Sequence, residues 1–190
     1  MTIAQSWRRA LFGTLLGLVA LLIGGAASAA ELAAPSGPVV LTVAGEVGQT
    51  NRPAFDPFRD AFLNYHDKGF ERAAAFDRAM LQALGIQTIT IDYAGWPGVM
   101  RFEGPWLRDL LAAAGAAGRP VTVLALDGYA IEISAEEIAT LPWMVALKAN
   151  GRDLATGGHG PTWVLYQPDG PATDEDEARW GWAVFFIEVE

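Results

Sequence analysis

Residues 92–115 read DYAGWPGVMRFEGPWLRDLLAAAG, and in this stretch the end of a strand, a loop and the start of a helix meet. The preceding residues, 86–91, alternate apolar and polar side chains and are rich in β-branched ones, which predicts a half-buried strand. The GPWLRDLLAAAG half predicts an amphipathic helix, because a proline opens it, leucines recur at helical spacing and a glycine ends it. We therefore expect functional side chains at the strand end, where Asp92, Tyr93 and Trp96 begin the loop.

Short strands and short helices are predicted on both sides of this stretch. Asp127-Gly128 separates two alternating apolar runs, 121–126 and 129–133, and predicts a β-hairpin. Ser134 and Glu137 form a capping-box pattern that opens a single short helix. The other predicted strands are 39–47, 143–148, 162–166 and 182–189, and the other predicted helices are 56–69 and 73–84.

Two rows of large apolar side chains accompany the two helices predicted before residue 85. The first row is Phe58, Ala61, Phe62 and Tyr65, and the second is Phe76, Met80, Leu81 and Leu84. Stripes at helical spacing belong to a core more often than to a ligand site. We therefore predict that both rows are buried and assign them no function.

The first 29 residues have the pattern of a secretory signal peptide. Arg8 and Arg9 precede an apolar run at 10–23, and Ala27-Ser28-Ala29 matches a cleavage signal. An uncleaved signal anchor is the alternative, but the apolar run is shorter than the ~20 residues that a membrane span needs. We predict export to the periplasm and removal of residues 1–29.

Composition bounds what the remaining chain can do. Residues 30–38 are predicted to be a poorly ordered linker, and residues 39–190 a single domain. The formal net charge is −9, and an acidic domain argues against binding to nucleic acid or to anionic membrane surfaces. The chain has no cysteine, so its stability must come from packing without disulfides. The acidic run at 173–177 is interpreted as a solvated loop or helix start, because it lacks the ligand spacing of a calcium site.

The motifs of the chain resemble, in their order, the sulfite-oxidase fold, which is the oxidoreductase molybdopterin-binding domain. They are a strand, a G-W loop, a short strand, the segment GPWLRDLL, then Asp127-Gly128-Tyr129 and His159-Gly160-Pro161. The resemblance covers nearly all of the chain after residue 39. It implies a single α+β domain of mixed β-sheets with short peripheral helices, and a pterin-binding region at the strand ends.

Two positions depart from the molybdenum enzymes that the chain resembles. Those enzymes carry a metal-binding cysteine at the position of Asp92 and an arginine at the position of Trp163. Without any cysteine, this chain has no thiolate for the metal. Its two histidines, His66 and His159, are too few for a zinc site, and without a cysteine or a histidine cluster a catalytic triad is not expected. The resemblance therefore implies a family member that lacks the molybdenum cofactor and has no covalently bound cofactor.

Six residues are candidates for contacts with a ligand: Asp92, Tyr93, Trp96, Tyr129, His159 and Trp163. Asp92 either accepts the paired N–H donors of a pterin ring or caps the amides of its own loop, and the sequence leaves both interpretations open. His159 lies in a glycine-rich loop that the family places beside the pterin, with a structural hydrogen bond as the equal alternative. Trp163 offers a flat stacking face, whereas Trp96 also occurs in the metal-containing members and is expected to be scaffold.

Three functions are compatible with these observations. The leading hypothesis is a periplasmic, non-catalytic module that binds a reduced, unphosphorylated pterin. It would act as a sensor or ligand-delivery partner of a membrane signalling protein, a partner that only the resemblance implies. The rival is a molybdopterin-dependent oxidoreductase, or a subunit of one that another chain completes. The third is a structural or interaction domain with a closed pocket, which would show no heat-stability shift with any heterocycle.

Overall fold

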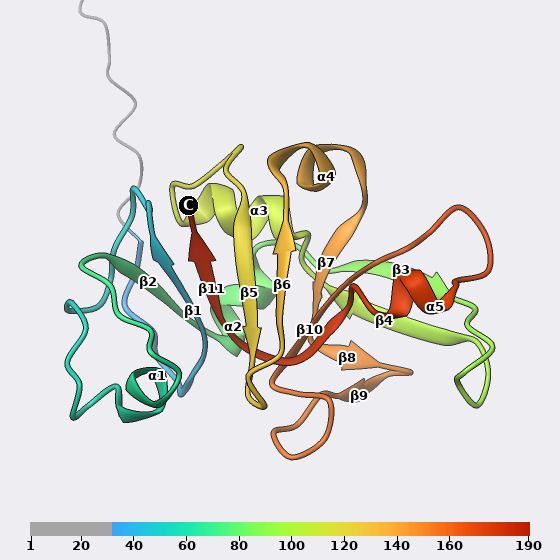
Figure 1. The fold of residues 1–190 in the computed structure, drawn as a ribbon, viewed down its shortest axis with the longest axis horizontal. Helices are drawn as coiled ribbons and strands as arrows, with labels where there is room; N and C mark the ends of the chain where they lie inside the picture. Colours follow the sequence, from blue (N-terminus) through green and yellow to red (C-terminus); the bar gives the residue numbers. More distant parts are fainter. Residues whose placement is uncertain (1–31) are drawn as a thin grey trace, which may run out of the picture. The chain divides into compact units, whose positions relative to one another are not determined.

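The computed structural model describes residues 32–190, so the predicted signal peptide lies outside the described residues. Two β-sheets are combined with short helices at their margins (Figure 1), which confirms the predicted α+β class with mixed sheets. Within residues 32–190, no helix is both long enough and apolar enough to cross a membrane.

The larger sheet has seven strands and branches at its longest one, β11 (Gly181–Val189). Its main path follows the order β2-β1-β11-β10-β7, and β5 pairs with both β11 and β6. The pairing of β1 with β11 is parallel, and the other pairings are antiparallel. The remaining strands of this sheet are β1 (Val39–Gly45), β2 (Ala73–Asp77), β5 (Val121–Ala125), β6 (Ala130–Ile133), β7 (Trp143–Ala146) and β10 (Thr162–Tyr166).

The smaller sheet has four antiparallel strands in the order β3-β4-β8-β9. These are β3 (Gln87–Ile91), β4 (Met100–Gly104), β8 (Lys148–Ala149) and β9 (Arg152–Asp153). The helices are α1 (Ala61–Tyr65), α2 (Arg78–Ala83), α3 (Leu107–Ala113), α4 (Ala135–Thr140) and α5 (Asp174–Glu177).

The stretch at 92–115 folds as its sequence predicts. It follows β3, contains β4 and α3, and its predicted apolar helix face is completely buried. Gly104 allows β4 to meet β7, because a Cβ at this position would lie 2.0 Å from the carbonyl oxygen of Val145. The adjoining Pro105 carbonyl accepts a hydrogen bond from the Val145 N–H at 2.9 Å. These contacts place the start of α3 directly on the larger sheet.

The helix predicted over 73–84 is wrong in its first half. Ala73 to Asp77 form strand β2, which pairs with β1 and is fully buried, and only residues 78–83 are helical. Alanine favours helices, but sheet pairing and burial override such a weak local preference. Asp77 then begins α2 by accepting a hydrogen bond from the Met80 N–H at 2.8 Å.

The burial predicted for the first aromatic row is also wrong. Phe58 is 91% exposed, Tyr65 78% and Phe62 45%, and the buried residue of α1 is Leu63. In the second row, the predicted burial is confirmed for Phe76 and Leu81.

The segment predicted as a poorly ordered linker is instead attached to the domain from Leu32 onward. Leu32 packs on the core, and the N–H groups of Ser36 and Gly37 donate to the Asp77 carboxylate at 2.7 and 2.8 Å. The Asp77 carboxylate thus binds both the segment before β1 and the first turn of α2.

Candidate functional site

The loop after β3 contributes the first two candidate residues. Asp92 is exposed, and its carbonyl accepts a hydrogen bond from the Ala172 N–H at 2.7 Å. Tyr93 is half-buried, and its hydroxyl donates to Asp174 at 2.9 Å. Within residues 32–190 the Asp92 carboxylate forms no hydrogen bond to its own loop, so it is free to accept donors from another molecule.

Trp96 lies at the centre of an aromatic cluster. Its ring centroid is 5.4 to 5.6 Å from four others, in arrangements that are tilted or edge-to-face. Edge-to-face contacts of this kind add to the stability gained from burial. The four neighbouring rings belong to Tyr93, Phe102, Trp163 and Trp180. This packing is consistent with the scaffold role expected of Trp96.

His159 covers one face of Trp163. The two rings are stacked with centroids 4.6 Å apart and planes inclined by 10°. Trp163 is only 4% exposed, whereas His159 is exposed, so the imidazole forms the solvent side of the stack. The flat face that the sequence suggested for a ligand therefore already holds a small heteroaromatic ring.

Two glycines shape the loop that carries His159, and an alanine of β11 with an unusual backbone conformation is hydrogen-bonded to it. Gly157 has φ +93°, and a Cβ at Gly160 would lie 2.5 Å from the backbone of Leu154. The His159 carbonyl accepts a hydrogen bond at 2.9 Å from the N–H of Ala183, whose φ of +54° is unusual for a residue other than glycine. Strain of this kind persists only where surrounding contacts enforce it.

Tyr129 stands apart from the other aromatic candidates. Its hydroxyl donates to the carbonyl of Ala178, and its side chain is 47% exposed. The structure therefore brings Tyr93, Trp96, His159 and Trp163 into one connected series of rings and leaves Tyr129 outside those ring contacts.

Sequence reasoning missed three members of this site. Trp180 packs against Trp96 and Tyr93, and the exposed Trp182 meets His159 edge-on at 5.7 Å. The third is Asp174, which receives the Tyr93 hydroxyl. No local pattern identifies these residues, because the contacts join segments far apart in the chain.

Helix α5 makes the surroundings of Tyr93 negatively charged. All four of its residues, Asp174 to Glu177, are acidic, and the exposed Asp92 lies nearby through the Tyr93–Ala172 bridge. The hydrogen bond to Asp174 raises the pKa of Tyr93, and burial adds to that effect. Burial raises the pKa of Tyr166 to about 12, helped by its bond to Asp176, which ties α5 to β10. A negatively charged ligand group would be repelled here.

Three buried indole N–H groups have no hydrogen-bond partner within residues 32–190. Those of Trp163 and Trp180 belong to the rings that surround Trp96, and the third is that of Trp143. A buried donor without a partner costs free energy.

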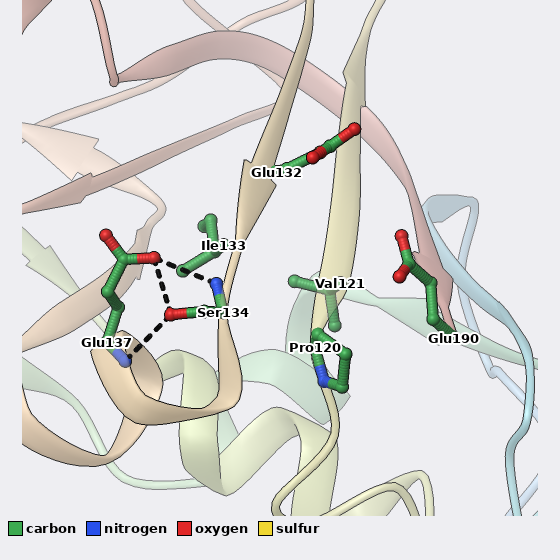
Figure 2. Close-up of a pocket in the computed structure, with 7 residues that line it drawn as sticks. All are labelled: Pro120, Val121, Glu132, Ile133, Ser134, Glu137 and Glu190. Atoms are coloured by element: carbon green, nitrogen blue, oxygen red, sulfur yellow. Dashed lines mark hydrogen bonds between the residues drawn. The ribbon is translucent and has the colours of Figure 1, made fainter.

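Two clefts of the described residues lie elsewhere. One, of about 280 Å3, is lined by Pro120, Val121, Glu132, Ile133, Ser134, Glu137 and Glu190, which Figure 2 shows. The Glu137 carboxylate in this cleft accepts hydrogen bonds from Ser134 (Figure 2) and pairs with Arg179 at 2.6 Å, so this side chain is already engaged within the domain. A larger cleft of about 480 Å3 includes Arg52 and Asp60, which form an ion pair with each other. Neither cleft contains the aromatic candidates.

The residues at this site do not suit a molybdenum cofactor. Where the resemblance places a metal-binding cysteine the chain has the Asp92 carboxylate, and within residues 32–190 no three His, Cys, Asp or Glu side chains are grouped as metal ligands. The arginine expected to face the anionic cofactor is the buried Trp163, and α5 adds negative charge. We therefore derive no chemistry through that cofactor.

No protein-family model matches the chain, and no curated protein is significantly similar to it. Its function is therefore argued from the geometry.

Proposed function

We propose that this protein is a non-catalytic binding module for a flat heteroaromatic ligand, a reduced and unphosphorylated pterin. The observation that carries the proposal is the nearly parallel stack of exposed His159 on buried Trp163. In this interpretation the imidazole is a placeholder, and the ligand takes its position on the indole face. Stacking on an indole is worth about 0.5–1.5 kcal/mol beyond the burial of area.

The charge distribution supports a ligand without phosphate. Asp92 is exposed and accepts no bond from its own loop, so it can accept two neighbouring N–H donors of a pyrimidine edge. The acidic helix α5 opposes phosphate groups but not a neutral ring.

The biological setting is part of the same proposal. We infer a metal-free member of the sulfite-oxidase-fold family, exported to the periplasm, that senses the ligand or delivers it to a membrane signalling protein. The order of motifs and the cleavage pattern at Ala27-Ser28-Ala29 support this setting.

The test is an anaerobic titration with a tetrahydropterin, followed by tryptophan emission. Wild-type emission should be quenched, and Trp163→Phe should lose most of the quenching while keeping an aromatic ring in the core. Asp92→Ala should weaken binding by ~1.5–3 kcal/mol, the size of a hydrogen bond to a charged group. Asp169→Ala removes another exposed carboxylate and serves as the matched control.

His159→Ala decides how the stack works. With no imidazole to displace, this variant should bind the tetrahydropterin more tightly than wild type. Weaker binding would show that His159 contacts the ligand directly. Tighter binding of a phosphorylated pterin, or wild-type titrations for both Trp163→Phe and Asp92→Ala, would refute the proposed site.

A further inference from the structure

Aromatic side chains on and beside α1 are exposed, although the sequence predicted that they would be buried. We call Phe58, Phe62, Tyr65 and Phe185 the aromatic face. Phe62 packs on Phe185 with ring centroids 5.1 Å apart and is stacked with Tyr65 at 6.5 Å, so the rings of Phe62, Tyr65 and Phe185 form one continuous apolar surface. Phe58, on the turn before α1, is 91% exposed. Exposed aromatic side chains in a contiguous patch mark interaction sites.

The charges beside the aromatic face indicate what would bind it. Asp67 follows the helix directly, and Asp127 lies on the hairpin turn whose Gly128 approaches His66. Of the nearby cations, Lys68 is paired with Glu188 at 2.6 Å. The backbone N–H of Arg59 binds Asp56 at 2.8 Å, but its guanidinium forms no ion pair among residues 32–190, so one unpaired cation lies beside the carboxylates of Asp56, Asp67 and Asp127. An apolar centre with an acidic margin complements a partner whose apolar side chains are flanked by lysine or arginine.

The same charges disfavour two other occupants. A second copy of this chain would bring a second acidic margin, since the sequence as a whole has a formal net charge of −9. An anionic lipid surface would be repelled for the same reason. A basic partner protein is the occupant that charge favours.

Hydrogen bonds connect the loop that carries His159 to the hairpin that lies next to His66. The His159 carbonyl accepts from Ala183, and the Ala183 carbonyl accepts from Leu126 at 3.0 Å, in the hairpin that contacts His66. Displacement of His159 would therefore disturb residues that border this face.

We propose that the aromatic face is the docking surface for a protein partner that presents apolar side chains surrounded by lysine or arginine. The inference rests on the proposed function only in taking a signalling protein as the partner, and the docking surface does not require the pterin.

The test places a photo-reactive benzophenone amino acid at position 65 in the native cells, with position 86 as the control. Ile86 is 45% exposed and directly precedes β3 of the smaller sheet, so it is an exposed apolar side chain outside the aromatic face. We expect a cross-link to one protein from position 65 and none from position 86. The cross-linked peptide should be rich in lysine or arginine.

Binding is then measured with the purified pair. Tyr65→Asp and Phe58→Asp should each weaken binding about tenfold or more, as for central aromatic residues of interfaces, while Ile86→Asp binds normally. Raising the ionic strength from about 0.01 M to about 1 M shortens the Debye length from ~30 to ~3 Å and should slow association. Both exposed side chains can be changed without loss of the fold, which a melting curve verifies.

Three results would overturn the inference: no cross-link from position 65, a cross-link to a second copy or to an acidic peptide, or binding of purified protein to anionic lipid vesicles through this face. The tetrahydropterin titration of Tyr65→Asp separates the two proposals. If wild type and Tyr65→Asp both fail to bind the pterin while the cross-link forms, the proposed function fails and the docking surface stands.

Discussion

Helices α3 and α1 have the same kind of sequence pattern but lie in opposite environments. Both carry apolar side chains at helical spacing, and neither N-cap residue, Trp106 or Asp60, caps its helix with a side chain. The apolar face of α3 is completely buried and contacts β7 and α4. Helix α1 buries Leu63 but leaves Tyr65 in solvent, and Phe58 on the turn before the helix is also exposed.

The difference shows that apolar periodicity predicts a helix but does not predict whether another element packs on its apolar face. The start of α3 is delivered onto β7 by the close approach of Gly104 and by the bridge between Trp106 and Met144. No described element covers the aromatic side of α1 in the same way. An apolar stripe on a short helix can therefore be core or binding surface, and the connection that precedes it decides which.

The largest effect is expected in α3. Leu110→Ala should lower the free energy of unfolding by about 2–5 kcal/mol, because it removes a fully buried side chain and leaves a cavity. Chemical denaturation followed by circular dichroism measures this change. A loss below about 0.5 kcal/mol would show that α3 is not the buried member of the pair.

The next effect concerns Asp77, which starts α2 with a cap in contrast to α3 and α1. Hydrogen bonds from the N–H groups of Met80 and Gly37 lower the pKa of Asp77 from 3.8 to about 2. Its contribution to stability is therefore complete above pH 3.8 and is lost as the pH falls toward 2. Asp77→Asn should destabilise the protein at neutral pH, and its difference from wild type should shrink over that acid range. A difference that is independent of pH would contradict this account.

A smaller effect is expected at the capping box of α4. Ser134→Ala removes the acceptor of the Glu137 N–H and should cost about 1 kcal/mol. Thr140→Ala, near the other end of the same helix, also removes a hydroxyl and is the matched control, since its hydroxyl only donates to the Glu136 carbonyl. Equal losses in thermal unfolding for the two variants would mean that the box adds nothing specific.

The smallest effect is expected on α1. Tyr65→Ala and Phe58→Ala should each change the free energy of unfolding by less than about 0.5 kcal/mol, since both side chains are mostly exposed. Denaturant melts measure these changes beside that of Leu110→Ala. A loss of about 2 kcal/mol at either position would place these rings in the core and remove the contrast between the helices.

The parts of the fold that the sequence could predict are those set by residues close together in the chain. The turn at Asp127-Gly128 joins β5 to β6, and Ser134 with Glu137 forms both hydrogen bonds of a capping box, because these interactions span only a few residues. The strand at 73–77 could not be predicted in this way, because its alanines carry no local signal for the pairing with β1.

The candidate site was less predictable than the fold. The resemblance drew attention to His159 and Trp163, which are in fact stacked, but neither residue type nor spacing indicates that one ring covers the other. Trp180 and Trp182 join the cluster through contacts between distant segments. The binding of a pterin at these residues remains a prediction that the titrations above address.

The parallel pairing of the first and last strands has a consequence for folding. Thr42 of β1 lies opposite Phe186 of β11, so the central pair of the larger sheet joins the two ends of the domain. Residues 181–189 must be synthesised before β1 can pair with β11, and contacts between distant residues slow folding. The larger sheet therefore cannot be completed until β11 has joined it. Deleting β11 should accordingly abolish folding of the whole sheet rather than trim its edge.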